Sequence, residues 1–370
     1  MKVLHVESGM HFYGGALQVV FLLEGLNKLG VENVLACPQG SAIAKEAPPQ
    51  TDVRTLPMGG DLDVALLGRL RKLIRETKPD LITLHSRRGS DIWGALAGRL
   101  EGIPVILCRR VDNPESRWIV NIKYRLYDKI ITISEGIRRV LISEGVPSEK
   151  IHCVLDSVDT DLYAPDKSNL DWFRKTFKIG QNEQVIGMVA QFIGRKGHQT
   201  LLDALPAVLA QHPATKVILF GQGPLRDSIQ AQINASQVLR EHIQLPGFRN
   251  DLMKILPCLD VLAHPAYMEG LGVSLLQAAA CGVPLVGARA GGIPEIIQPG
   301  LNGELIEPGD SSALTHHLNA LLDSAKLRQK YGQAARERVV SKFSIQTMVQ
   351  DTLSVYQLLS TASTQARKSA

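Results

Sequence analysis

The feature that most restricts the fold is a regular alternation of short apolar segments with helical stretches. The first half contains four expected strands and three expected helices: 3–7, 81–85, 105–108 and 129–133, with helices at 16–29, 91–100 and 135–144. The second half repeats this order, with strands at 184–191, 216–220, 243–245, 261–264, 285–287 and 303–306, and helices at 198–211, from 225, at 273–280 and from 311 to about 359. Strands that alternate with helices form parallel sheets with helices on both faces.

A polar segment at 156–169 separates the two halves and is expected to be a linker. The sequence therefore predicts an α/β protein with two Rossmann-like, doubly wound domains, at 1–165 and 166–345. A last helix, 346–370, is expected to pack back on the first domain. Two such domains that face each other place the carboxyl ends of their strands, where ligands bind, across a shared cleft.

Composition excludes several classes of protein. Hydrophobic residues make up 45% of the chain and charged residues 21%, which is too apolar for a disordered protein. The five Cys include no CxxC pair, so reduced thiols in a cytosolic protein are expected. The N-terminus lacks the apolar core of a signal peptide, and Gln277, Pro284 and several Gly interrupt the longest uncharged stretch. We expect a soluble protein, or one peripheral to a membrane.

Several glycine-rich turns follow expected strands. The dinucleotide and P-loop fingerprints are both absent, but Gly14 and Gly15 precede the first helix, where free N–H groups could face a ligand. At 189–197, Arg195 and Lys196 lie in a Gly-flanked loop between a strand and a helix. A bidentate guanidinium and an ammonium at that position suit a diphosphate. An ordinary tight turn and a solvated basic loop are the alternatives.

The most specific stretch is 264–278. Glu269 lies in a turn with Gly270, Leu271 and Gly272, and Gln277 follows Glu269 by eight residues, a little over two helical turns. A carboxylate and an amide on one side of a ligand could accept hydrogen bonds from sugar hydroxyls, while the helix dipole would point at its phosphates. Gly221 and Gly291–Gly292 provide further turns at strand ends. Together these features suit a nucleotide sugar.

These motifs resemble those of the retaining GT-B glycosyltransferases of family 4. Glu269 matches the first acid of the family's Glu-Gly-Phe-Gly turn, and Gln277 stands where a second Glu is usual. Lys196 falls on the lysine of the family's phosphate loop, whereas Gln191 replaces its usual Arg. The glycine turn at 14–15, the segment 132–135 and the stretch 282–303 also match. The resemblance covers nearly the whole chain and implies a GT-B fold, in which both Rossmann-like domains face a cleft.

The resemblance also implies a role for each matching residue. Arg195 and Lys196 would stabilise the leaving diphosphate, Glu269 would bind the transferred sugar and Gln277 the ribose. His85, at the end of an expected strand, would lie near the reaction centre, although a lone His there is often structural. The other implied donor-binding positions are Gly14, Gly15, Gln191, Gly221, Phe248, Arg249, Gly270, Leu271 and Gly272. No metal or other cofactor is expected, and the DxD patterns at 61–63 and 159–161 are interpreted as chance spacings in polar loops.

The positive charge is concentrated in one segment. The chain carries a formal charge of +5, but 69–139 contains 16 Lys plus Arg against 8 Asp plus Glu. We expect Arg87, Arg88, Arg109 and Arg110 to form an acceptor or membrane face that attracts an anionic lipid surface or a phosphorylated acceptor. A scattered solvated surface is the alternative, and nucleic acid is not an expected partner.

The sequence as a whole predicts a retaining, metal-independent glycosyltransferase. The first domain would bind a cell-envelope acceptor, such as lipopolysaccharide core or a lipid-linked glycan, and the second a nucleotide-sugar donor, with UDP the expected nucleotide. The protein would be cytoplasmic and could be peripheral on the inner face of the inner membrane. A GT-B nucleotide-sugar epimerase and a non-catalytic nucleotide-sugar-binding protein remain open alternatives.

Overall fold

The computed structural model describes residues 1–87, 89–111 and 115–368, and it divides into two compact units. Unit 1 comprises Met1–Ser157 together with the segment that begins at Ile345, and unit 2 comprises Val158–Ser344. The first boundary therefore lies eight residues before the one expected from the sequence. The polar segment after it belongs to unit 2 because Val158 donates its N–H to the Phe343 carbonyl at 2.9 Å.

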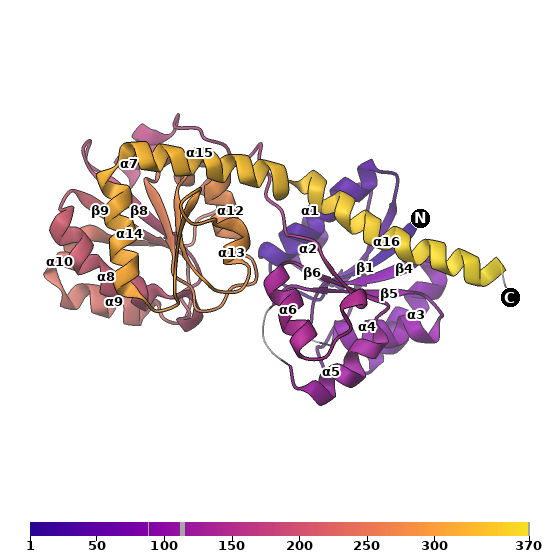
Figure 1. Cartoon of the computed structure of the whole chain (residues 1–370). Helices are drawn as coiled ribbons and strands as arrows, with labels where there is room; N and C mark the ends of the chain where they lie inside the picture. The colour runs from indigo at the N-terminus through magenta and orange to yellow at the C-terminus, as the bar shows by residue number, and fades with distance from the viewer. Residues whose placement is uncertain (88, 112–114, 369–370) are drawn as a thin grey trace. The chain divides into compact units, whose positions relative to one another are not determined.

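Unit 1 is a seven-stranded parallel sheet with helices on both faces (Figure 1). Its strands are β1 (Lys2–Val6), β2 (Glu32–Pro38), β3 (Asp52–Leu56), β4 (Leu81–Leu84), β5 (Val105–Arg109), β6 (Lys129–Thr132) and β7 (Ile151–Cys153). Its helices are α1 (Gly14–Lys28), α2 (Ala42–Glu46), α3 (Ala65–Thr77), α4 (Ser90–Leu100), α5 (Arg117–Lys123), α6 (Glu135–Ser143) and α16 (Ile345–Lys368). The strand order is β3-β2-β1-β4-β5-β6-β7.

The last helix, α16, packs on one face of the unit 1 sheet. Met348 and Tyr356 are buried in one cluster with Val3 of β1, Leu22 of α1 and Ile106 of β5. These strand residues alternate with those of the opposite face, as the pleat of a strand requires. The C-terminal helix is therefore part of the unit 1 core, where it contacts α1 and β4.

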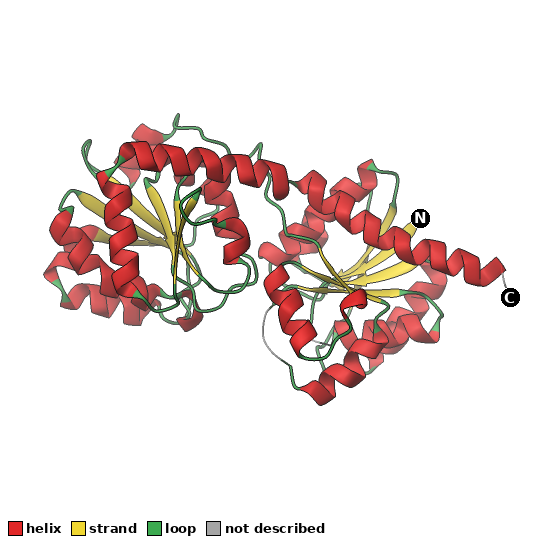
Figure 2. Cartoon of the chain, viewed as in Figure 1, coloured by secondary structure: helices red, strands yellow, loops and turns green. Residues whose placement is uncertain are grey.

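Unit 2 is a six-stranded parallel sheet that is also covered by helices on both faces (Figure 2). Its strands are β8 (Gln184–Val189), β9 (Thr215–Phe220), β10 (Ile243–Gly247), β11 (Val261–His264), β12 (Leu285–Ala288) and β13 (Gly303–Ile306). Its helices are α7 (Leu170–Thr176), α8 (His198–Gln211), α9 (Arg226–Ala235), α10 (Gln237–His242), α11 (Leu252–Ile255), α12 (Val273–Ala280), α13 (Ile293–Ile296), α14 (Ser311–Asp323) and α15 (Ala325–Lys342). The strand order is β10-β9-β8-β11-β12-β13.

Each sheet has one point at which the winding direction reverses. In unit 1 the chain moves outward from β1 to β3 and then returns to place β4 beside β1. In unit 2 it moves outward from β8 to β10 and returns to place β11 beside β8. Loops that leave two such strands diverge to opposite faces, so a crevice opens between them at the carboxyl edge of the sheet. The fold thus singles out the loops after β1 and β4, and those after β8 and β11.

Candidate functional site

The carboxyl ends of β8 and β11 and the loops that follow them bring two side chains to one carboxylate oxygen of Glu269. Lys196 ends a short 3₁₀ helix, Gly194–Lys196, and its Nζ lies 2.5 Å from Oε2 of Glu269. His264, the last residue of β11, places Nε2 2.7 Å from the same oxygen. An ionised carboxylate only accepts hydrogen bonds, so both nitrogens donate to it. The two residues that the sequence singled out, Lys196 and Glu269, are therefore brought together at the switch point of the sheet.

Glu269 is held in its ionised form. Burial alone would raise its pKa, but the hydrogen bond from His264 and the positive charge of Lys196 outweigh that effect and hold the pKa well below its usual range. Both the Lys196 and the Glu269 side chains are mostly buried, at 11% and 12% exposure. The site therefore presents a fixed acceptor beside a fixed cation, and sequence reasoning had not identified His264 as their third member.

Two glycines allow the loops at this edge to approach one another closely. Gly197 has a φ of +75°, and a Cβ there would lie 1.8 Å from the Pro265 carbonyl oxygen. Gly221 has a φ of +146°, and a Cβ there would lie 1.9 Å from the Ala190 carbonyl oxygen. Neither position can carry a side chain without a movement of the backbone. The loops after β8, β9 and β11 are thus packed backbone to backbone.

Arg195 joins the phosphate loop to the acidic loop through its main chain. Its carbonyl accepts the N–H groups of Tyr267, at 2.8 Å, and Met268, at 3.3 Å. Its side chain is exposed, as is that of Gln191. The remaining members of the predicted acidic turn, Gly270, Leu271 and Gly272, precede α12, and Gly272, its N-cap, takes a φ of +108°. Arg195 is therefore at the surface, whereas the side chain of Lys196, its neighbour in the sequence, is mostly buried.

Other predicted donor-binding residues have partners within unit 2. Gln277 is buried, and its Nε2 donates to the Tyr163 hydroxyl at 3.0 Å, a contact that the sequence did not suggest. Arg249 is held by Asp251 through two hydrogen bonds of 2.8 and 2.5 Å. Phe248, by contrast, is 62% exposed. The loop after β10 thus exposes the aromatic ring of Phe248, while Asp251 holds the guanidinium of Arg249, the next residue in the sequence.

In unit 1, the loops after β1 and β4 border a cavity of about 220 Å³. His85 lines this cavity and is itself almost fully buried, and its Nε2 lies 2.9 Å from Nδ1 of His5. Gly14 and Gly15 form the first turn of α1, where a Cβ on Gly15 would lie 3.6 Å from Cδ of Arg110. The predicted glycine turn, His85 and Arg110 therefore belong to one region of unit 1.

The predicted basic face is largely paired within the protein. Arg87 lies 2.5 Å from Glu115, and Arg110 forms an ion pair with Asp156. Arg109 is not on an exposed face, because its side chain is 2% exposed, but it lines the unit 1 cavity near Glu115, and its place on an acceptor or membrane face stays a prediction. Arg88 falls outside the described residues. A charge count overestimated this face because it cannot identify which cations lie inside and already face carboxylates.

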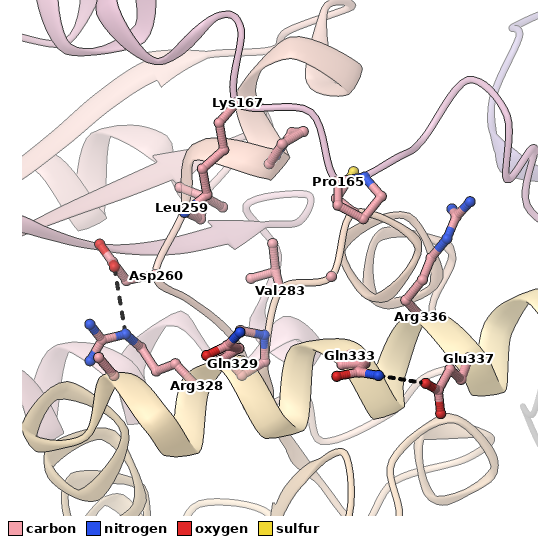
Figure 3. A pocket seen from close by; sticks show the side chains of 15 residues that line it. Pro165, Lys167, Leu259, Asp260, Val283, Arg328, Gln329, Gln333, Arg336 and Glu337 are labelled. Carbon is pink, nitrogen blue, oxygen red and sulfur yellow. Dashed lines mark hydrogen bonds and ion pairs between the residues drawn. The ribbon is translucent and has the colours of Figure 1, made fainter.

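A larger cavity, of about 780 Å³, lies at the opposite edge of the unit 2 sheet (Figure 3). Leu259 and Asp260, which precede β11, and Val283, which precedes β12, line it together with α15. In Figure 3, Arg328 of α15 points to Asp260, and the two lie 3.6 Å apart. This cavity of unit 2 is therefore distinct from the Lys196–Glu269 site.

No group of three or more His, Cys, Asp or Glu side chains is placed to hold a metal ion in the part of the chain that the structure describes. Within the same residues, no helix is both long and apolar enough to cross a membrane. In the two DxD patterns, Asp63 pairs with Arg69 at 2.5 Å, and Asp159 accepts the N–H groups of Asp161 and Leu162.

Two family models match the chain in succession. The model described as Glycosyltransferase Family 4 matches residues 13–162, and the one described as Glycosyl transferases group 1 matches residues 171–338. One curated relative is the Escherichia coli UDP-Gal:alpha-D-GlcNAc-diphosphoundecaprenol alpha-1,3-galactosyltransferase, 24% identical over 89% of this chain and 92% of the relative. A GDP-mannose-dependent phosphatidylinositol monomannoside mannosyltransferase of Mycolicibacterium smegmatis is 28% identical over 80% of this chain and 74% of its own.

A solved structure shows the same fold at low sequence identity. The Anabaena protein HepE, in complex with UDP and glucose, superposes with a TM-score of 0.83 over 96% of this chain and 99% of its own, at 22% identity. Together the two models span most of the chain, one in each unit, and the strand orders are those of two Rossmann-like domains. The chain therefore belongs to the glycosyltransferases of family 4 and has their GT-B fold.

Proposed function

We propose that this glycosyltransferase transfers a sugar, with retention of its anomeric configuration, from a UDP-sugar to a cell-envelope saccharide or lipid-linked acceptor. The observation that carries the proposal is the Lys196–Glu269 ion pair at the switch point of unit 2. His264 holds Glu269 in place through a further hydrogen bond. A buried cation beside a buried acceptor supports the binding of a diphosphate next to a hydroxylated sugar.

In the proposed reaction, Lys196 and Arg195 bind the diphosphate of the donor. As the bond between the sugar and the diphosphate breaks, negative charge develops on the leaving phosphate. Cations that are already in position stabilise this charge without the reorganisation that water would need. Because Arg195 is exposed and Lys196 is mostly buried, Lys196 contributes the larger share.

Glu269 accepts hydrogen bonds from hydroxyls of the transferred sugar. Its lowered pKa keeps it ionised at neutral pH, so it stays an acceptor throughout the reaction. Gln277 would reach the ribose through its amide, and it differs from a carboxylate in that it forms no charge-assisted hydrogen bond. The exposed Phe248 and the adjacent Arg249, whose orientation Asp251 fixes, would contact the base.

The proposed nucleotide is supported by two of the proteins described above. The E. coli relative is named for UDP-Gal, and the Anabaena structure contains UDP. The Mycolicibacterium relative is instead named as GDP-mannose-dependent, so GDP-sugars are the competing donors. A lipid acceptor draws support from the same names, because one refers to diphosphoundecaprenol and the other to phosphatidylinositol.

A position at the inner face of the inner membrane is part of the proposal. The short helix α5 exposes Trp118, at 68%, and Ile122, at 65%, which is unusual for large apolar side chains. Binding to vesicles that contain anionic lipid should weaken at high ionic strength if the basic residues of unit 1 contribute. Binding that does not respond to salt would contradict the electrostatic part of this proposal.

The test is a panel of UDP- and GDP-sugars, incubated with the protein and with saccharide or lipid-diphosphate acceptors, with products followed by mass spectrometry. Transfer from a UDP-sugar, with the anomeric configuration of the donor retained in the product by NMR, would support the proposal. Conversion of a nucleotide sugar without acceptor would favour an epimerase instead. Binding without turnover would favour a non-catalytic binding protein, which the uncharged Gln191 and Gln277 at usually charged positions also suggest.

The assignment of Glu269 is tested separately. Glu269→Ala should abolish most transfer, and Glu241→Ala, on the exposed end of α10, is a matched control that should retain it. Unchanged transfer by Glu269→Ala would contradict the assignment.

A further inference from the structure

A chain of hydrogen bonds runs through unit 1 from β2 to the cavity beside His85. The Nε2 atom of His5 lies 3.0 Å from Oδ1 of Asn33, and Nδ1 of His5 lies 2.9 Å from Nε2 of His85. All three side chains are buried, at 0–3% exposure. The residues are 28 and 80 positions apart in the sequence, and they meet because β2, β1 and β4 are neighbours in the sheet.

One backbone carbonyl fixes the donor and the acceptor in each of the hydrogen bonds that link Asn33, His5 and His85. The side-chain nitrogen of Asn33 lies 3.1 Å from the Val31 carbonyl oxygen, which can only accept, and 2.7 Å from Oδ1 of Asn27. Oδ1 of Asn33 therefore faces His5 as an acceptor, and Nε2 of His5 carries the hydrogen. In a neutral ring the other nitrogen is then the acceptor, so Nε2 of His85 must donate to Nδ1 of His5.

The ring geometry supports this assignment. The planes of His5 and His85 lie within 10° of each other, with centroids 5.2 Å apart. Since the lone pair of an imidazole nitrogen lies in the ring plane, two nearly parallel rings suit an N–H···N hydrogen bond. Burial lowers the pKa of His5 to about 4 and that of His85 well below its usual value, so both rings are neutral at pH 7. Tyr356 of α16 packs beside His5 and helps to keep water out.

The remaining nitrogen of His85 is left as an unused acceptor. Nδ1 is buried and has no hydrogen-bond partner among the residues that the structure describes. A buried acceptor without a partner is costly and calls for a ligand or a water molecule. His85 lines the cavity of about 220 Å³, together with Ser8, Ser86 and Arg110.

We propose that Asn33 and His5 are positioning residues that hold His85 in the Nε2–H form, so that its Nδ1 accepts a hydrogen bond from a substrate hydroxyl in the unit 1 cavity. The inference rests on the proposed function for the identity of that hydroxyl, which belongs to the donor sugar or to the acceptor saccharide. It assigns His85 as a hydrogen-bond acceptor only, and it gives two buried residues of β1 and β2 a role in the reaction.

The first test is the protonation pattern of His85 in the free protein, which does not depend on any activity. Long-range ¹H–¹⁵N spectra of protein labelled in the histidine rings distinguish the two forms, and His85→Gln assigns the signals. Wild-type protein at pH 7 should show His85 with a hydrogen on Nε2 and none on Nδ1. The opposite pattern would overturn the proposal.

Asn33→Asp is the informative variant because it changes little in size. A carboxylate at this position should favour a positively charged His5, whose Nδ1 would then donate and force His85 into the Nδ1–H form. His5→Phe is a second variant, which should leave His85 as a mixture of both forms. Thr83→Val is the matched control. It removes a buried hydrogen bond to Tyr356 from the same sheet and leaves the hydrogen bonds between Asn33, His5 and His85 unchanged.

The second test is turnover of whichever nucleotide sugar the donor panel identifies. Asn33→Asp and His5→Phe should each lower kcat/KM about tenfold, whereas Thr83→Val should leave it close to wild type. If neither variant alters the His85 pattern, the proposal is overturned whatever the kinetics. Should wild-type protein transfer no sugar, the proposed function fails, and the spectra alone still decide the inference.

Discussion

The two switch points of the molecule differ in the side chains that are hydrogen-bonded together there, although charged side chains such as Arg110 also line the unit 1 cavity. In unit 2, Lys196 and His264 meet an ionised Glu269, so the site combines fixed charges of both signs. In unit 1, His5, His85 and Asn33 form a buried and neutral chain of hydrogen bonds. A charged cluster suits a group whose charge changes during the reaction, whereas a neutral series of hydrogen bonds suits recognition of hydroxyls. The same architecture thus offers a different chemistry at each of its two crevices.

The largest expected effect comes from the charged site. Lys196→Ala should lower kcat about 10²–10³-fold, because it removes a preorganised cation from the developing charge and leaves Glu269 buried without it. Arg195→Ala, at an exposed position, is the comparison and should cost much less. Steady-state kinetics at saturating donor measures both. Equal losses in the two variants would contradict the dominant role of the buried cation.

The next effect concerns the two glycine-rich turns. Gly197→Ala should destabilise unit 2 by at least about 2 kcal/mol, since the residue has a positive φ and a Cβ would collide with the Pro265 carbonyl. Gly15→Ala should change the stability of unit 1 by less than about 1 kcal/mol, because its Cβ would meet only Cδ of Arg110 at 3.6 Å. Urea unfolding followed by hydrogen exchange in each unit distinguishes them. A tolerated Gly197→Ala would show that the loops of unit 2 are not locked together.

The pH dependence of the free energy of unfolding can be tested in each unit by replacing one buried histidine, His5 in unit 1 or His198 in unit 2. The pKa of His5 falls to about 4 in the folded protein from 6.5, so the unfolded chain takes up a proton first. Stability should therefore decrease as the pH falls from about 6.5 towards 4, by up to about 3 kcal/mol for this residue. His5→Phe should reduce the slope for unit 1 by about one proton near pH 5, as measured by urea unfolding at several pH values.

His198→Phe is the matched change in unit 2, because burial also lowers the pKa of His198 to about 4. It should reduce the slope for unit 2 and leave that of unit 1 unchanged. Glu269 acts at lower pH, since its lowered pKa contributes stability that is present above about 4.5 and is lost as the pH falls further. A wild-type protein whose stability is flat between pH 6.5 and 5 would contradict the neutral state of the buried rings.

The smallest expected effect is at Gln277. Gln277→Glu should tighten nucleotide-sugar binding about three- to tenfold if this side chain reaches the ribose, because a carboxylate forms the stronger hydrogen bond. Tyr163→Phe is the control, since it removes the hydroxyl that Nε2 of Gln277 contacts without changing the amide. Calorimetry with UDP gives the affinities. An unchanged affinity would assign Gln277 to packing inside unit 2.

Much of the fold could be predicted because the strands of unit 2 are short, apolar and evenly spaced. The sequence predicted β11, β13, α8 and α12 with the residue ranges that the structure shows. It missed β3, whose sequence DVRTL is half polar and lies at the sheet edge, and β7, which has three residues. It also missed β2, although six of its seven residues are buried, because an unbroken apolar run has no period that marks it as a strand.

Members of the candidate site could be predicted only where each lies in a recognisable local motif. Lys196 and Glu269 were found because each lies in a glycine-rich turn, and His264 could have been found because it ends the strand before Glu269. His5 and Asn33 carry no such signal, since only the strand order brings them to His85. The burial of Arg109 could not be predicted, because a charge count treats a buried cation like an exposed one.

The most direct test of the charged site is calorimetric titration of UDP into wild-type protein, Lys196→Ala and Arg195→Ala. The account predicts that wild-type protein binds UDP, that Lys196→Ala weakens binding at least tenfold, and that Arg195→Ala weakens it less. Wild-type protein that binds no UDP in this titration and no GDP in a parallel one, or a Lys196→Ala variant that binds as tightly as wild type, would contradict the assignment of a diphosphate to this site.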